Sequence, residues 1–253
     1  MCGRYAILDG KKIFLTFEKL KDLEVRGQAF EMLPRYNAAP TDSLPVIAMR
    51  DRNLGVERMR WWLIPHTSQD GKPLMGSDNR PLSAFNAKGE TLESSRLFSP
   101  YFQNARCLVP ADAFYEWKKI SVTGIVGGKK RESVEKQPVV FRMQDERMFM
   151  FAGLFSVWRN VQGEEFPSFA IITTEPNELM KPVHNRMPVI LHENDFDQWL
   201  HRDNKDTEEL KKLLFPYPAE QMKAYPVSKL VSSSRNDRPE CLEPIKTEQP
   251  LFE

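Results

Sequence analysis

The second residue of the chain carries the first group that could do chemistry. The chain opens with "MCGRY", and Cys2 is small enough for Met1 to be removed. A chain that starts at Cys2 holds two nucleophiles on adjacent carbons, an α-amine with a reference pKa of ~7.7–8.0 and a thiol with a pKa near ~8.5. The alternative is an ordinary small apolar residue near the start of a strand.

Two further residues are candidates for acid–base work. Glu116 lies among aromatic residues in "DAFYEWKK", where burial would raise its pKa, whereas a strand edge facing water would leave an ordinary carboxylate. His184 stands between Pro182 and Pro188, which restrict the backbone on either side. Held in one orientation, its imidazole could exchange protons at neutral pH; the alternative is a loop histidine without a role.

Polar and basic residues stand close to these positions in the sequence. Asn86, which can donate and accept hydrogen bonds, opens the stretch "NAKGETLESSR" with Lys88 and Arg96. Arg186 follows His184 by two residues. The basic side chains are either contacts for phosphate or ordinary surface charges. Asn37 and Pro40 lie in the turn-rich stretch "RYNAAPTDSLPV", which by itself predicts only a loop.

Short strand-like runs must position these residues. They include "CGRYAIL", "LPVIAMR", "VERMRWWLIP", "RCLVPADAFYEW", "QPVVFRM", "MFMFAGLFSVW", "SFAIITT" and "PVILH". Helical patterns are fewer and cover 11–23, 193–202 and 206–215, with Asp206 and Thr207 as the cap region of the last. Strands and helices do not alternate, so we predict an α+β fold around a curled, largely antiparallel, barrel-like sheet with flanking helices.

The chain is expected to form one domain over residues 1–253. Residues 121–137, rich in glycine and basic residues, predict a long exposed hairpin loop, and 246–253 a C-terminal tail. The "GGKKR" stretch in that loop could touch phosphates or be simply solvated. Neither this loop nor the irregular stretch 68–81 separates two domains, because strand patterns resume on both sides.

Composition excludes several classes of protein. The net charge of +1 creates no global field for nucleic acid, so a DNA partner would need a local basic patch. Three cysteines and four histidines show no metal-ligand or disulfide spacing, and no nucleotide-binding motif is present. No secretory signal or membrane-spanning run stands out. We therefore expect a cytoplasmic monomer without metal, cofactor or membrane contact.

Taken together, the short motifs resemble one known family. "MCGRY", "RYNAAPT", "WWLIP", "FNAKGET", "RCLVPADAFYEW", "MFAGLF", "AIITTEPN", "VHNRMP" and "VSSSRNDRPECLEP" occur in the order found in SRAP (SOS response-associated peptidase) domain proteins. The resemblance runs from residue 2 to about residue 245. Each motif is short, but the whole set is specific.

The resemblance implies an enzyme of the DNA damage response that captures abasic sites in single-stranded DNA. Met1 would be lost, the amine of Cys2 would form a Schiff base with the sugar aldehyde, and the thiol would close a thiazolidine ring. Glu116 would position the amine and move protons, His184 would act as acid and base, and Asn86 would orient the cysteine and the sugar. Nucleoid association follows if the chain is bacterial.

The same resemblance implies the DNA contacts. The positions that match phosphate contacts are Arg4, Lys88, Arg96 and Arg186, and Asn37 and Pro40 match the loop that supports a kinked strand beside the lesion. Two positions depart from the family pattern: Lys88 replaces the more usual arginine, and Trp62 stands where glycine is expected. The tryptophan that bacterial members tend to have soon after Pro65 is also missing.

The family name also implies that the protein processes its own N-terminus, and that Glu116 and His184 reverse the crosslink slowly. Two alternatives from other classes stay open at this point. One is a cysteine peptidase that acts on proteins, with Cys2 as nucleophile and His184 as base. The other is a non-covalent single-stranded DNA-binding protein.

Overall fold

Five strands close into a barrel in the computed structural model, which describes residues 2–50, 52–76, 79–126 and 129–246. They are β4 (Ser43–Arg50), β5 (Asn53–Trp61), β7 (Arg106–Ala111), β10 (Phe149–Arg159) and β11 (Glu165–Thr174). Four antiparallel pairings run in the order β11-β10-β7-β4-β5, and a parallel pairing of β5 with β11 closes the ring. Inward-facing aromatic residues fill the barrel; the rings of Trp61 and Phe169 stack with their centroids 6.2 Å apart.

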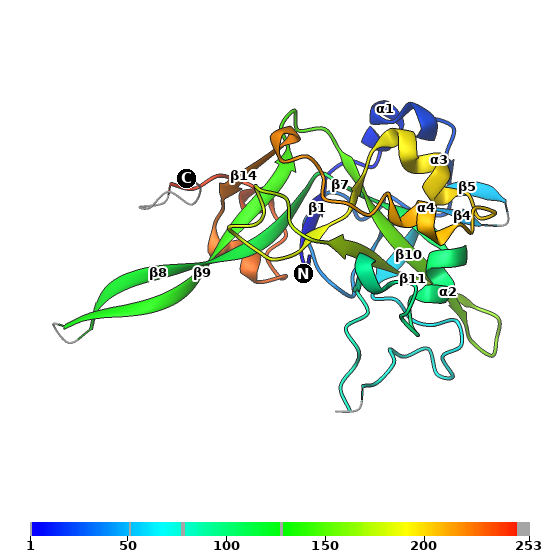
Figure 1. Cartoon of the computed structure of the whole chain (residues 1–253), viewed down its shortest axis with the longest axis horizontal. Helices are drawn as coiled ribbons and strands as arrows, with labels where there is room; N and C mark the ends of the chain where they lie inside the picture. Colours follow the sequence, from blue (N-terminus) through cyan, green and yellow to red (C-terminus); the bar gives the residue numbers. More distant parts are fainter. Residues whose placement is uncertain (1, 51, 77–78, 127–128, 247–253) are drawn as a thin grey trace.

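A second sheet of five strands packs beside the barrel. Its order is β14 (Met222–Pro226), β9 (Lys129–Met143), β8 (Ala113–Val126), β1 (Tyr5–Ile7) and β3 (Arg35–Ala38). The strands β8 and β9 form a long ribbon that projects from the body in Figure 1. The N-terminal strand β1 lies between β8 and β3, so the first residues of the chain are held inside the fold.

The ribbon corrects one prediction. Residues 121–137 were expected to form an exposed hairpin loop, but the backbone pairs from Ser121 with Val134 out to Val126 with Lys129. Glycine and charged residues have low strand propensity, and the cross-strand hydrogen bonds of a long antiparallel ribbon override that preference. Residues 127 and 128 lie outside the described residues, as does 247–253 of the expected C-terminal tail.

The remaining elements are short. The other strands are β2 (Glu24–Val25), β6 (Asn86–Lys88), β12 (Met187–Pro188) and β13 (Ile190–Leu191). The α-helices are α1 (Lys12–Thr16), α2 (Ser99–Asn104), α3 (Phe196–Leu200) and α4 (Thr207–Lys211). The 3-10 helices are η1 (Glu18–Leu20), η2 (Gly89–Thr91), η3 (Glu193–Asp195), η4 (Ala219–Gln221), η5 (Lys229–Ser232) and η6 (Pro239–Cys241).

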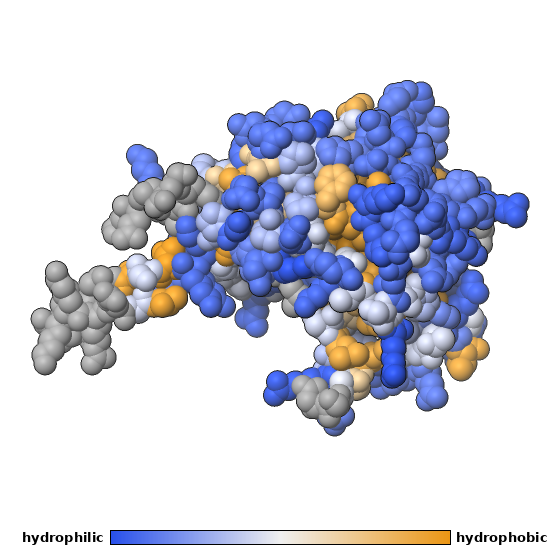
Figure 2. Space-filling model, in the orientation of Figure 1, coloured by the Kyte–Doolittle hydropathy of each residue, from blue (hydrophilic) through white to orange (hydrophobic). Residues whose placement is uncertain are grey.

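The predicted α+β class with a curled, mainly antiparallel sheet is confirmed. Asp206 caps α4, since its carboxylate accepts a hydrogen bond from the Glu209 amide at 3.1 Å. The helix expected over 11–23 is broken at Phe17, whose extended backbone lets its ring pack on Phe196. In the described part of the chain no helix is long and apolar enough to cross a membrane. The face in Figure 2 is mostly hydrophilic, with apolar residues in small separate groups.

Candidate active site

The pairing of β1 with β8 brings Cys2 to Glu116. Tyr5 pairs with Phe114, and the Tyr115 amide donates to the Arg4 carbonyl at 3.1 Å, so the pairing continues toward the N-terminus. Cys2 is fully buried. Burial, and secondly the charge of Glu116, raise the pKa of the Cys2 thiol well above its ordinary value. The thiol is therefore neutral at physiological pH and lies within the electrostatic reach of one carboxylate.

Asn86 fixes the backbone of Cys2 from the other side. The short strand β6 pairs in parallel with β11, with Asn86 opposite Ile171. Its Nδ2 donates a hydrogen bond to the Cys2 carbonyl at 2.8 Å. The Asn86 Oδ1 is buried and accepts no hydrogen bond from the described residues. A buried acceptor of this kind is costly unless a donor arrives, so Oδ1 can receive an N–H or O–H of a bound group.

Glu116 has the electrostatic character of a proton-transfer group. Its side chain is 5% exposed. Burial raises the pKa of its carboxyl from 4.5 to about 7, although a backbone hydrogen bond from Trp117 acts in the opposite direction. At neutral pH both protonation states are therefore populated, which is what an acid–base catalyst needs.

His184 faces Glu116 across a short gap. Its Nε2 lies 3.9 Å from Glu116 Oε2. The backbone of Arg186 holds the other ring nitrogen: Nδ1 lies 3.1 Å from the Arg186 amide nitrogen and 3.2 Å from its carbonyl oxygen. The amide N–H can donate to Nδ1 of the neutral imidazole, and the carbonyl oxygen can accept from the Nδ1–H of the imidazolium. The ring therefore keeps its orientation in both protonation states. Burial lowers the pKa of His184 and favours the neutral form.

Three of the four basic residues predicted to contact phosphate make no ion pair among the described residues. They are Arg4, Lys88 and Arg96. Arg4 is half-buried, which lowers its pKa, and its Nη1 donates to the neighbouring Gly3 carbonyl at 2.8 Å. Lys88 and Arg96 are exposed. Cations without acidic partners can accept a phosphate without first breaking an ion pair.

Arg186 differs from these three residues because it already forms an ion pair with a carboxylate. Its Nη1 and Nη2 contact the two oxygens of Glu90 at 2.5 and 2.8 Å, and Nη2 also donates to the Thr173 carbonyl at 2.5 Å. A phosphate would have to displace Glu90 from this bidentate pair. Sequence reasoning did not find this pair, since its two members lie 96 positions apart and no local pattern links them.

Asn37, which was expected in a loop, lies in strand β3 and is a buried structural residue, because this segment pairs with β1. Its Nδ2 donates to the carbonyls of Val231, Ser233 and Asn236 at 3.1, 2.9 and 2.8 Å. Its side chain is fully buried, so Asn37 makes no direct contact with a ligand. It acts only by fixing the position of the loop that carries these three carbonyls.

The loop after Asn37 turns sharply at Pro40. Thr41 has a φ of 87°, which is rare for a β-branched residue, and its amide donates to the Trp61 carbonyl at 2.9 Å. Asp42 fastens the turn, since its carboxylate accepts from the Ala39 amide at 3.0 Å and pairs with Arg35 at 2.6 Å. Pro40 is thus held on a rigid turn at the end of β5.

Trp62, one of the two departures from the family pattern, packs beside the site. Its ring lies 5.4 Å from that of Phe85, which directly precedes Asn86. The indole fills space that glycine would leave open, and it supports the strand that holds Asn86.

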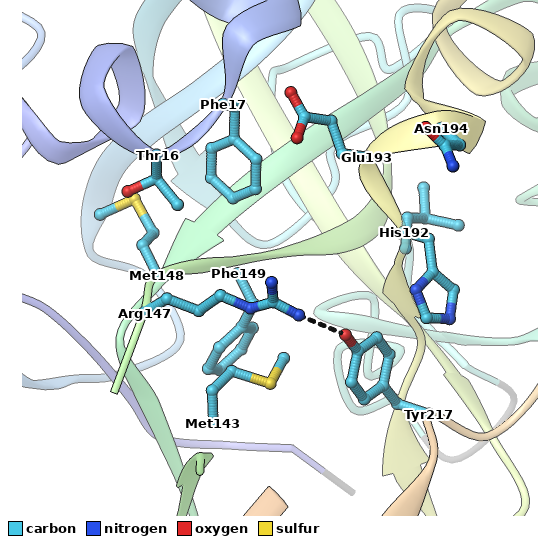
Figure 3. A pocket seen from close by; sticks show the side chains of 11 residues that line it. Thr16, Phe17, Met143, Arg147, Met148, Phe149, His192, Glu193, Asn194 and Tyr217 are labelled. Carbon is cyan, nitrogen blue, oxygen red and sulfur yellow. Dashed lines mark hydrogen bonds between the residues drawn. The ribbon is translucent and has the colours of Figure 1, made fainter. Parts of the chain in front are cut away.

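A separate cavity of about 260 Å³ lies at the start of β10 (Figure 3). Arg147 and Tyr217 join across it by a hydrogen bond of 3.1 Å between Nη2 and the phenol oxygen. None of the candidate site residues lines it. Among the described residues no group of three or more histidine, cysteine, aspartate or glutamate side chains could hold a metal ion.

Comparison with known proteins matches this chain along most of its length. The family model described as SOS response associated peptidase (SRAP) matches residues 1–234. A Bacillus subtilis relative named abasic site processing protein YoqW is 35% identical over 96% of this chain and 99% of its own. The chicken relative, Gallus gallus abasic site processing protein HMCES, is 31% identical over 97% of this chain and 78% of its own.

Solved structures show the same fold. A Bacteroides thetaiotaomicron protein covers 97% of this chain and 100% of its own, with a TM-score of 0.74 at 23% identity. A phage-related protein of Bordetella bronchiseptica covers 89% of this chain and 94% of its own, with a TM-score of 0.64 at 26% identity. With the family model matched over most of its residues, this chain belongs to the SRAP family.

Proposed function

We propose that this protein captures abasic sites in single-stranded DNA through a covalent bond to Cys2, after Met1 has been removed. The observation that carries the proposal is the cluster of Cys2, Asn86, Glu116 and His184 around the start of β1. Relatives named abasic site processing proteins support the same substrate. Met1 itself lies outside the described residues, so its removal stays a proposal.

The reaction begins at the amine. The ring-opened abasic sugar presents an aldehyde, to which the neutral α-amine of Cys2 adds; loss of one water then gives an imine. The Cys2 sulfur adds to the imine carbon while its proton passes to the nitrogen, which closes a five-membered thiazolidine ring. The overall change is loss of one water, with no oxidant or reductant.

Glu116 and His184 divide the proton transfers. Because the pKa of Glu116 is about 7, its carboxylate can take a proton from the amine or the thiol and return it to the leaving water. His184, held by the Arg186 backbone in either protonation state, can protonate the sugar oxygen during ring opening. Run in reverse, the same transfers would release the DNA.

The state of the thiol argues against a peptidase that acts on other proteins. Cysteine nucleophiles of that kind depend on a lowered pKa, whereas burial and Glu116 raise the pKa of Cys2. An amine that reacts first does not need a thiolate. Removal of Met1 by the protein itself is a single intramolecular event and remains part of the proposal.

The experiment is incubation with a single-stranded oligonucleotide that contains one abasic site, followed by denaturing electrophoresis. We expect a crosslinked band with the native chain, no band with Cys2→Ala, and an unchanged band with the matched control Cys241→Ala, which alters another buried cysteine. Non-covalent DNA affinity should be retained in Cys2→Ala. A salt-sensitive shift without a denaturant-resistant band would instead identify a simple DNA-binding protein.

A further inference from the structure

A second pocket lies on the outer side of the barrel, away from the reacting cysteine. It has a volume of about 400 Å³, and its polar walls come from β4, β5 and β11. Arg60 pairs across the sheet with Ser43 on one side and with Ser168 on the other, so the three side chains share one face. Arg58 lies on the same face of β5, two residues earlier.

The two arginines of this pocket are uncommitted. In the described part of the chain neither Arg58 nor Arg60 has an ion-pair partner, and the buried Nε of Arg58 makes no hydrogen bond. The acidic residue of the pocket, Glu165, is already paired with Arg50 and Arg159. The pocket therefore has an excess of positive charge with free N–H donors, which is the chemistry that binds phosphate.

An aromatic wall stands beside the arginines. The rings of Trp158 and Phe166 lie 5.3 Å apart, and Phe166 remains 45% exposed. Trp158 is fixed from behind, since its Nε1 donates to the Ser68 carbonyl at 2.7 Å. An exposed ring on a rigid support next to two cations is the combination that single-stranded nucleic acid uses, with a base on the ring and its phosphate on the arginines.

Two connections lead from the pocket toward the candidate active site. The rigid turn at Pro40 leads directly to Ser43 in the pocket wall, while the charge of Asp42 in the same turn acts on Arg4. Along β11, the register position of Arg60 lies three residues from that of Asn86, which is ~10 Å in a strand. Stacked nucleotides advance ~3.4 Å each, so this distance corresponds to about three nucleotides along the DNA strand.

We infer that this pocket, which Arg58, Arg60 and Phe166 line, is a subsite that binds an unmodified nucleotide of the DNA strand that carries the abasic site. The inference rests on the proposed function for the identity of the ligand. It extends that function because it gives the protein a hold on intact DNA at a distance from the lesion. On this inference the DNA strand bends at the turn around Pro40, where it passes the rim of the barrel.

The test is non-covalent binding to a single-stranded oligonucleotide without any abasic site, measured by fluorescence anisotropy over a range of salt concentrations. The Arg58→Gln/Arg60→Gln variant should bind more weakly, and its salt slope should fall by about 0.7 for each phosphate that the protein no longer holds. Phe166→Ala, on an exposed ring, should lose roughly tenfold in affinity with little change in slope. The control Arg147→Gln removes one charge at the far end of β10 and should leave the affinity and the salt slope unchanged.

Crosslinking separates this inference from the proposed function. With an abasic oligonucleotide trimmed to one nucleotide on each side of the lesion, the pocket variants should crosslink at the native rate. If native protein binds DNA but never crosslinks, the proposed function fails while the salt slopes still test the pocket. The pocket inference is overturned if the double variant and Phe166→Ala bind intact single-stranded DNA with the native affinity and slope.

Discussion

Replacing Glu116 by glutamine should make the protein more stable at alkaline pH while it damages the reaction. The amide has nearly the shape of the carboxyl group but cannot ionise. In the folded protein, burial raises the pKa of this carboxyl from 4.5 to about 7. Between these two values the folded chain keeps a proton that the unfolded chain has lost, so the contribution of Glu116 to stability is complete below pH 4.5 and is lost as the pH rises through 7.

The size of the effect follows from the same shift. A difference of roughly 2.5 pKa units corresponds to about 3 kcal/mol at ~1.4 kcal/mol per unit. The free energy of unfolding of Glu116→Gln, relative to the native chain, should therefore increase by about 3 kcal/mol between pH 4.5 and about pH 8. Groups that do not interact with Glu116 titrate alike in both chains and cancel in the difference.

Urea denaturation at a series of pH values measures this difference directly. Crosslinking rates on the same series should rise in both chains as the α-amine, whose reference pKa is ~7.7–8.0, loses its proton. The native chain should show an additional rise through about pH 7, and this rise should be absent from a slower Glu116→Gln. A stability difference that stays constant across the series would refute the reasoning, because it would mean that the buried carboxyl titrates near its ordinary value.

Three further substitutions test the surroundings of the site. Asn86→Ala leaves the buried Cys2 carbonyl without its hydrogen-bond donor. The free energy of unfolding should therefore fall by about 1–3 kcal/mol, and crosslinking should slow. Unchanged urea curves and unchanged crosslinking rates would contradict the assigned hydrogen bond. Glu90→Gln should release Arg186 and raise the affinity for single-stranded DNA, measured by anisotropy, up to about fivefold. The gain is limited because a partly exposed ion pair contributes only about 1 kcal/mol. A weaker complex would show that the ion pair organises the site. Lys88→Arg should strengthen the same binding by adding a two-pronged phosphate contact, and no gain would place Lys88 away from the DNA.

The sequence was informative where local chemistry decides the structure. Alternating apolar residues predicted the barrel strands, and Asp206 predicted the start of α4, because a short polar side chain before a helical pattern satisfies free amides there. The aromatic neighbours of Glu116 left a buried carboxyl and a strand edge facing water both open, and the flanking prolines of His184 left a fixed ring and a loop histidine without a role both open. The structure buries the Glu116 carboxyl and holds the His184 ring against the Arg186 backbone.

Long-range pairing is what local patterns do not reveal. The segment 121–137 has the composition of a loop, yet its two halves pair because β8 and β9 are already aligned at their base. Asn37 has the composition of an ordinary loop residue, and its buried bonds to residues some 194–199 positions away depend on the whole fold. The Glu90–Arg186 pair and the Arg58–Arg60 pocket likewise arise only when strands distant in sequence become neighbours.

The most direct test of the central claim is the intact mass of the purified protein before and after exposure to abasic single-stranded DNA. We expect a chain that begins at Cys2, and then a species heavier by the mass of the oligonucleotide less one water. A protein that retains Met1, or one whose mass is unchanged after exposure, would contradict the central claim.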